Sequence, residues 1–205
     1  MPGVVTAYTM GFPPGWASWT VGRGVETADA VAAKAADGPD AQELVRRGVL
    51  GLESLCEQEG LFFAAALWVP DRSTGETAAT ARLELLTGPR EVEASYEDAL
   101  QKARHLKGER GFKIFDRAVE EMTVPAGRAF AEVTMLAERS APFGRSKGPA
   151  RVESRVQITF FPPGCSEVLS LLVMTVDPTL TEAIAEAAHA AADSLTVTVG
   201  PPSTP

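Results

Sequence analysis

The segment that decides the fold is "RVQITFFPPGCSEVLSLLVMTV", residues 155–176. Its first part alternates apolar and polar side chains, as a strand does when one of its faces is buried. Its last part is apolar on both faces, which is typical of a strand in the middle of a sheet. Between the two, Pro162, Pro163 and Gly164 form a turn signal, because proline presets φ and glycine accepts a positive φ. The segment therefore predicts a β-hairpin at the centre of a sheet.

The letters FPPG also occur near the start of the chain, at residues 12–15. Trp16 and Trp19 follow this first copy, whereas Cys165 follows the second, and the flanking residues have nothing else in common. We interpret both copies as turns between apolar segments. A duplicated functional loop is rejected, and so is a polyproline recognition motif, because neither Pro pair lies in a Pro-rich tract.

Two further hairpins are predicted on either side of the central one. Residues 112–124 and 127–139 flank a Pro-Ala-Gly turn, and the second of these segments alternates along its length. Residues 61–69 are apolar throughout, residues 81–85 alternate, and the polar stretch 71–76 is predicted to be the hairpin tip between them. Most of the sheet is therefore expected to be antiparallel.

Three amphipathic helices are predicted from apolar residues at helical spacing. They cover residues 40–59, 95–107 and 177–194, with Asp40, Ser95 and Asp177 as the expected N-caps. A short edge strand is predicted just before Pro201 and Pro202, which end regular structure.

The glycine pair Gly22 and Gly24 is interpreted as a turn. A phosphate-binding loop needs a third glycine and a following helix, and we expect neither here.

Composition limits the class of protein and its partners. The chain of 205 residues, 45% hydrophobic, is expected to form a single domain over residues 1–205 with a disordered tail at 200–205. A formal net charge of −8 repels phosphate backbones and anionic headgroups, and no apolar stretch is long enough to span a bilayer. We therefore expect no nucleic acid and no membrane as partners.

The two cysteines indicate neither a metal site nor a redox pair. Cys56 lies on the apolar face of a predicted helix, and Cys165 follows a tight turn far away in the sequence. Without an export signal at the N-terminus, the expected location is the reduced cytoplasm.

The sequence offers little that could perform covalent chemistry. It has two histidines, no nucleophile elbow and no cluster with metal-ligand spacing. Glu120 and Glu121 are adjacent on a predicted strand and so point to opposite faces, which prevents them from working as an acid/base pair. We therefore expect no catalytic residues, no cofactor and no metal; an enzyme is not excluded, but this inventory favours a non-enzyme.

The order of these elements resembles the PsbP-like superfamily over roughly residues 8–199, and more narrowly uncharacterised actinobacterial proteins of that fold. The resemblance rests on the "FPPGW" segment, a helix, a hairpin, a meander, the hairpin at 155–176 and the final helix "DPTLTEAIAEAAHAAADSL". It implies an α+β fold: an α/β/α sandwich with a central, largely antiparallel sheet flanked by helices and used for binding and assembly. It carries over no functional residues. The alanine-rich, asparagine-free composition fits a high-GC actinobacterial genome.

The first functional hypothesis is a non-enzymatic cytoplasmic protein-binding module, such as an adaptor, a secretion chaperone or an immunity-type protein. The partner protein is unknown. The candidate binding residues are Phe143, Arg145 and Lys147, in a basic loop between two predicted strands, where Phe143 could be an exposed aromatic anchor.

Two alternatives from other classes remain open. One is a small-molecule binder or hydrolase-like enzyme whose pocket lies between the first helix and the sheet and is lined by Trp16, Trp19 and Trp68. The other is a structural assembly subunit in which an unpaired sheet edge forms a homodimer.

Overall fold

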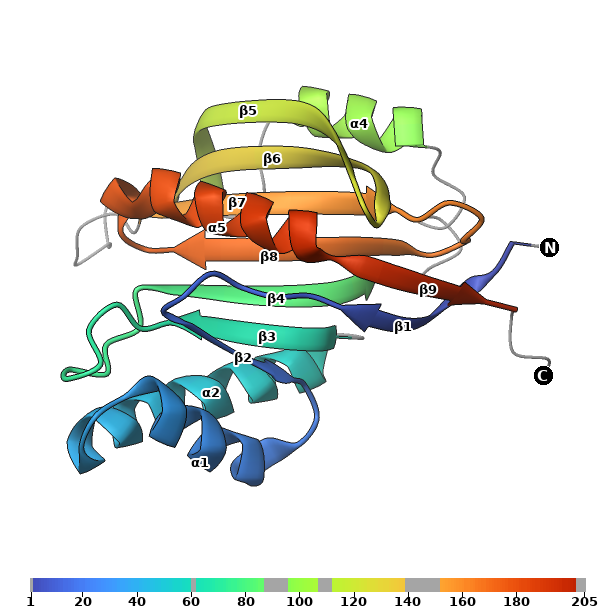
Figure 1. Cartoon of the computed structure of the whole chain (residues 1–205). Helices are drawn as coiled ribbons and strands as arrows, with labels where there is room; N and C mark the ends of the chain where they lie inside the picture. The colour runs from blue at the N-terminus through green and yellow to red at the C-terminus, as the bar shows by residue number, and fades with distance from the viewer. Residues whose placement is uncertain (1, 60–61, 87–95, 107–111, 139–151, 202–205) are drawn as a thin grey trace.

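The centre of the fold is an antiparallel sheet, seen in a computed structural model that describes residues 2–59, 62–86, 96–106, 112–138 and 152–201. Within these ranges the chain forms a seven-stranded sheet, a two-stranded ribbon and four α-helices (Figure 1). The helices are α1 (Gly24–Ala35), α2 (Pro39–Glu59), α4 (Tyr96–His105) and α5 (Thr181–Ser194), with a 3-10 turn, η1 (Pro178–Leu180), before α5. The strands are β1 (Val4–Thr9), β2 (Trp16–Thr20), β3 (Phe62–Trp68), β4 (Ala79–Leu86), β5 (Phe112–Val124), β6 (Gly127–Glu138), β7 (Val152–Phe161), β8 (Val168–Thr175) and β9 (Thr196–Gly200).

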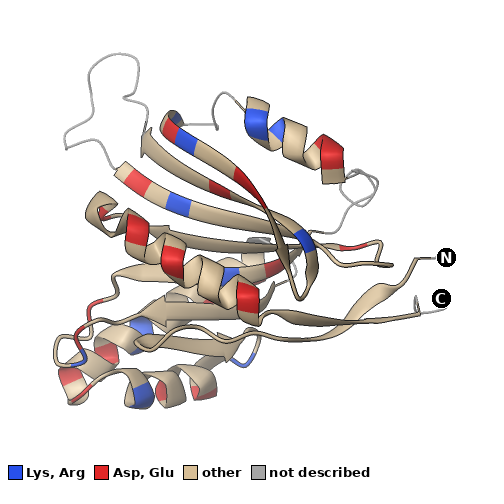
Figure 2. Ribbon diagram, turned by 45° about the horizontal axis from the view of Figure 1, so that its top comes forward, with Lys and Arg blue, Asp and Glu red and all other residues tan. Residues whose placement is uncertain are grey.

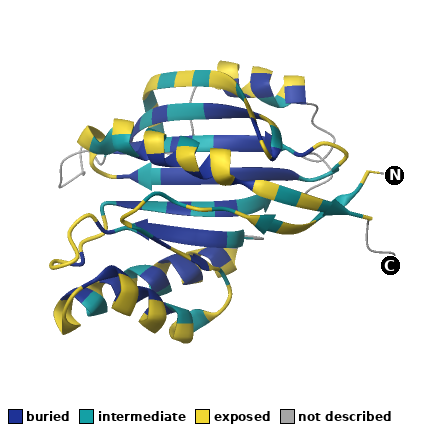
Figure 3. Ribbon diagram, in the orientation of Figure 1, coloured by how far each residue is buried: buried dark blue, intermediate teal, exposed yellow. Residues whose placement is uncertain are grey.

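The strand order of the large sheet is β2-β3-β4-β8-β7-β6-β5, and every neighbouring pair is antiparallel. All three predicted hairpins are present, as β3–β4, β5–β6 and β7–β8. Strand β8 lies in the middle of the order, as its apolar character on both faces predicts, and Figure 3 shows it buried along most of its length. Ile158 and Phe160 of β7, both fully buried, pair with Leu171 and Leu169 of β8.

Helices cover both faces of the sheet. On one face, α5 and the β1–β9 ribbon pack over a core that includes Ile158, Leu171 and Ile184. On the opposite face, α1 and α2 pack over β2 and β3, while α4 packs over β6 with Leu100 against Phe130. This arrangement confirms the predicted α+β class and its α/β/α layering (Figure 1).

Both FPPG segments are the same kind of turn. The N–H of Trp16 donates to the carbonyl of Pro13, and the N–H of Cys165 donates to the carbonyl of Pro162. The third position is a glycine with positive φ in each, 89° at Gly15 and 73° at Gly164. A turn with proline second and a positive-φ glycine third is typical of type II. The repeat is thus local turn chemistry, as interpreted from the sequence.

Helix α1 was not expected from the sequence. Gly22 lies in a turn just after β2, as interpreted from the sequence, but Gly24 is the first residue of α1, so the expectation that no helix follows is wrong. The buried face of α1 consists of three alanines and one valine: Ala28, Val31, Ala32 and Ala35. Alanine favours the helix but gives a weak apolar periodicity, which hides the helix from pattern reading.

The ends of the chain pair with each other. Strand β9 confirms the strand expected before Pro201, but it pairs with β1 in a separate ribbon and not with the edge of the large sheet. Gly200 belongs to this strand and pairs with Val4; residues 202–205 of the predicted tail lie outside the described ranges.

Of the three predicted N-caps, one is confirmed, one lies inside its helix and one falls outside the described residues. Asp177 caps η1 by accepting a hydrogen bond of 2.9 Å from the Thr179 N–H, and hydrogen bonds from the Thr179 hydroxyl and N–H lower the pKa of Asp177. Helix α2 begins at Pro39, so Asp40 lies in its first turn instead of capping it. A carboxylate there still favours the helix, because the N-terminus carries partial positive charge. Ser95 lies outside the described residues.

Replacing Gly75 with alanine is expected to lower the free energy of unfolding by about 2 kcal/mol. Gly75 lies between β3 and β4 with φ 70°, and a Cβ there would come within 2.3 Å of the Ala41 carbonyl oxygen of α2. Urea unfolding measures the change. Gly51→Ala is the matched control: no atom lies within 4 Å of its added Cβ, and alanine inside a helix should stabilise by about 0.5–1 kcal/mol. Equal effects of the two substitutions would contradict the close packing at Gly75.

Candidate functional site

Two of the three tryptophans stack on one face of the sheet. Trp16 of β2 pairs with Trp68 of β3, and their ring centroids lie 6.0 Å apart. Phe12 also stacks on Trp16, at 5.2 Å. All three rings are half-buried and pack against the core beneath α5.

Trp19 lies on the opposite face, where α1 and α2 pack. Its indole N–H donates to a carboxylate oxygen of Glu53 at 2.8 Å, and the N–H of Gly22 donates to the same carboxylate at 3.0 Å. Glu53 comes from α2 and is only 3% exposed. This buried carboxylate therefore joins α2 to both the end of β2 and the turn that leads into α1.

The structure does not bring the three tryptophans into one pocket, contrary to the prediction. Trp16 and Trp19 are three residues apart on a strand, and such residues point to opposite faces. Trp19 lines the groove beside α1 described below, and Trp16 lines a smaller one, of about 210 Å³, near the end of α1. The spacing could have excluded a shared pocket from the sequence once residues 16–20 were recognised as a strand.

Strand β2 is the terminal strand of the sheet, and its outer edge is available for pairing. The N–H of Val21 donates to Phe63 and the N–H of Val69 donates to Gly15. Since hydrogen-bonded pairs alternate along an antiparallel ladder, Ser18 and Thr20 direct their N–H and C=O groups away from β3. Both residues are exposed, and within the described ranges no other strand pairs with this side of β2.

The two edges of the sheet differ in a way that matters for pairing. Strand β5, at the far edge, carries charged side chains such as Lys113 and Asp116 and has a register shift between Ile114 and Asp116. Charges and bulges are the devices that keep an edge from pairing with another chain. Strand β2, "WASWT", has neither a charged residue nor a register shift. Of these two edges, β2 is the one suited to accept another strand.

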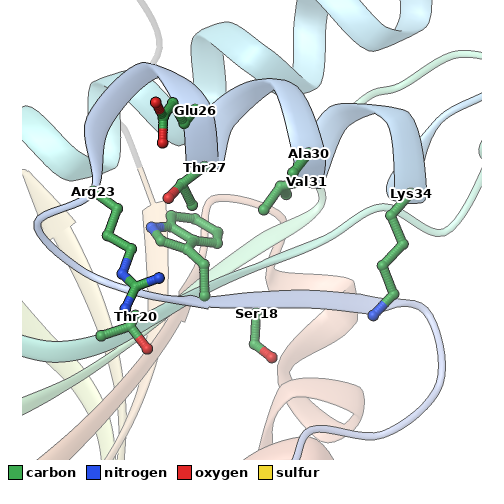
Figure 4. Close-up of a pocket in the computed structure, with 9 residues that line it drawn as sticks. Ser18, Thr20, Arg23, Glu26, Thr27, Ala30, Val31 and Lys34 are labelled. Atoms are coloured by element: carbon green, nitrogen blue, oxygen red, sulfur yellow. The ribbon is translucent and has the colours of Figure 1, made fainter.

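Two grooves flank the edge of β2. One, of about 490 Å³, lies between β2 and α1 (Figure 4), and the other, of about 440 Å³, lies between β2 and β1. Ser18, Trp19 and Thr20 line both. Because successive side chains of a strand point to opposite faces, a strand added to β2 would place every second side chain in each groove.

The grooves differ in charge. In Figure 4, Lys34 of α1 and Arg23, the residue before α1, extend to the level of β2 at the two ends of the first groove, and Glu26 of α1 also lines this groove. The second groove is lined by uncharged side chains, among them Tyr8 and Met10.

Tyr8 keeps this second groove neutral. Its hydroxyl donates to the Phe63 carbonyl at 2.8 Å. A tyrosine hydroxyl is protonated at neutral pH, and burial raises the pKa of Tyr8 further.

Sequence reasoning missed Ser18, Thr20, Arg23, Lys34 and Glu53 as candidates. An uncharged strand next to a turn was the available signal for Ser18 and Thr20. Nothing in the sequence placed Arg23 and Lys34 together, because their proximity depends on α1.

A second polar region lies between α2 and α4, on the face of the sheet that these helices cover. Its charged and polar side chains contact one another. Arg117 of β5 forms an ion pair with Glu132 of β6, and Arg155 forms an ion pair with Glu153 within β7. The amide of Gln157 donates to the hydroxyl of Ser170 at 3.1 Å. Most of these polar groups are paired, although the Nε of Arg117 is buried without a hydrogen-bond partner among the described residues, so we assign this region a structural role.

The remaining predictions concern the basic loop and metals. Phe143, Arg145 and Lys147 lie outside the described residues. Over the ranges that the structure covers, no group of three or more His, Cys, Asp or Glu side chains could hold a metal ion. No helix in the same ranges is both long and apolar enough to cross a bilayer.

Comparison with protein-family models finds no match, and comparison with curated proteins finds none. Among solved structures, the chain is similar to LpqN of Mycobacterium tuberculosis, which is involved in cell envelope biogenesis: 16% identity, 97% of this chain and 86% of that chain covered, TM-score 0.45. It is also similar to PA94 of Pseudomonas aeruginosa, a protein of unknown function: 16% identity, 55% of this chain and 69% of that chain, TM-score 0.33. Similarities with such low sequence identity and TM-score assign no function to this chain. The PsbP-like resemblance stays a prediction.

Proposed function

We propose that this chain is a non-enzymatic protein-binding module that holds an extended segment of a partner protein on the outer edge of β2. The observation that carries the proposal is the outward direction of the N–H and C=O groups of Ser18 and Thr20 on a terminal strand without charges. An added strand gains affinity from main-chain hydrogen bonds and specificity from pockets for alternate side chains. Here the two grooves are the places for those side chains.

The adaptor, secretion-chaperone and immunity-type roles each require that a segment of another protein be held, and the proposal includes all three. The small-molecule alternative loses its stated basis, because the tryptophans do not share one pocket. A homodimer through β2 uses the same edge and is distinguished by experiment below.

A cytoplasmic location is part of the proposal. Cys56 and Cys165 are both free thiols, as a reducing compartment keeps them. Burial raises the pKa of Cys165, so this thiol is a weak nucleophile at neutral pH.

Replacing Ser18 with proline is expected to weaken binding of extended peptides at least tenfold while leaving the fold intact. Proline removes the outward N–H that an added strand needs, and edge strands tolerate proline where the N–H faces solvent. The measurement starts with a phage-displayed library of random nine-residue peptides selected on the wild-type protein. Affinities of the enriched peptides for wild type and Ser18→Pro are then compared, and hydrogen exchange of the Ser18 and Thr20 amides is followed on the wild type.

Ser18→Ala is the matched control, because it removes the side-chain hydroxyl but keeps the backbone N–H. We expect it to bind as the wild type does, with slowed exchange at Ser18 and Thr20 in the wild-type complex. Selected peptides that bind Ser18→Pro as tightly as wild type, or a library that yields no binder, would contradict strand addition at β2.

A further inference from the structure

We propose that the β2 edge selects extended segments whose side chains alternate between acidic and apolar, with the acidic ones in the groove beside α1. This inference rests on the proposed function and specifies the chemical class of the bound segment. It follows from the different linings of the two grooves, which receive opposite faces of the same added strand.

The groove beside α1 is lined by two basic side chains, Arg23 and Lys34, and by one acidic side chain, Glu26. Arg23 precedes α1 and Lys34 lies in its last turn. Neither side chain forms an ion pair within the ranges that the structure covers, unlike Arg46, which contacts Asp29 at 2.7 Å. Figure 4 shows both extending toward β2, one near Thr20 and the other at the opposite end of the strand.

The spacing of the two basic groups suits an extended chain. Lys34 is eleven positions after Arg23, which corresponds to about 16 Å along a helix. Two residues four apart on a strand lie about 13 Å apart and on the same face. Carboxylates at such positions can therefore reach Arg23 and Lys34 at the same time, since both basic side chains are long and flexible.

The groove on the other side of β2 calls for apolar side chains. Met10 and Phe12 line it, both half-buried, and its lining contains no charged residue. A charged side chain placed there would lose hydration without a counter-charge, which is costly. A segment with alternating acidic and apolar side chains satisfies both grooves.

The net charge of −8 does not prevent an acidic segment from binding here. Charges beyond about 8 Å are largely screened at physiological ionic strength, so nearby groups dominate. Figure 2 shows acidic residues along α5, and that helix covers the opposite face of the sheet from the Arg23 groove.

A second copy of this chain is a poorer occupant than an acidic partner segment. Antiparallel pairing of two β2 strands would place Arg23 of one copy against Lys34 of the other on the same face, where like charges repel. Strand β2 also has no acidic residue of its own to offer.

The test uses three synthetic nine-residue peptides, acetylated and amidated, that alternate valine with glutamate, serine or lysine. Binding to the full chain is measured by fluorescence anisotropy at low and at physiological salt. We expect the glutamate peptide to bind at least tenfold more tightly than the lysine peptide, with the serine peptide between them and the difference reduced by salt. The double variant Arg23→Glu, Lys34→Glu should reverse this order.

The matched control is Lys102→Glu, Lys113→Glu, which changes the net charge equally with exposed residues of α4 and β5. It should keep the wild-type order of the peptides. If all three peptides bind wild type equally and Ser18→Pro still abolishes binding, charge selection is overturned and strand addition stands.

If none of the peptides binds wild type, or if all bind Ser18→Pro as they bind wild type, both proposals are overturned. A dimer of the free wild-type protein in sedimentation that Ser18→Pro dissociates would assign the edge to a second copy and overturn the acidic-segment inference.

Discussion

Phe160→Ala is expected to lower the free energy of unfolding by about 4 kcal/mol, the largest loss that we predict for a single substitution. Phe160 lies on β7 with none of its surface exposed, and it pairs with Ala129 of β6 on one side and Leu169 of β8 on the other. Alanine would leave a cavity beneath α5 that these neighbours, which belong to regular strands, cannot fill by collapsing. Loss of transfer free energy and the residual cavity both contribute.

Urea unfolding followed by circular dichroism measures this loss. Phe115→Ala is the matched control, because Phe115 lies on β5 with 61% of its surface exposed and should change stability by less than about 0.5 kcal/mol. If Phe160→Ala and Phe115→Ala unfold at the same urea concentration, the core beneath α5 is not packed around Phe160 as described.

Glu53→Ala is expected to lower the free energy of unfolding by about 3 kcal/mol and to loosen the β2 edge. The substitution leaves the buried indole N–H of Trp19 and the N–H of Gly22 without their acceptor. A buried donor that loses its partner costs its full desolvation free energy, and hydrogen bonds to a charged group are the stronger ones. Glu53→Gln should cost less, because the amide oxygen still accepts one of the two bonds.

Hydrogen exchange separates the local effect of Glu53→Ala from global unfolding. We expect the amide of Gly22 to exchange faster in Glu53→Ala at denaturant concentrations where β7 and β8 remain protected. Glu57→Ala, one turn further along α2 at an exposed position, is the control and should leave both readings unchanged. The role assigned to Glu53 fails if the two substitutions give the same unfolding curve.

The candidate site was only partly predictable. Interpreting residues 12–19 as a turn followed by two tryptophans was correct, but the interpretation stopped short of a strand. Trp16 and Trp19 point to opposite faces because residues 16–20 form β2, and that strand is held by β3 and by Glu53 of α2, more than thirty residues away in sequence. Pairing with residues that are distant in sequence produces little recognisable pattern within a five-residue segment.

The sequence by itself determined the elements whose signal is local. The hairpin at 155–176 follows from side-chain alternation, and the turn at each FPPG follows from the φ preferences of proline and glycine. Helix α5 follows from apolar residues at helical spacing. Only the tertiary structure decided that β2 is the terminal strand, that α1 exists beside it and that Arg23 and Lys34 lie along one groove. The physical reason is that alternation and capping act between residues a few positions apart, whereas strand order and groove lining depend on which distant surfaces bury each other.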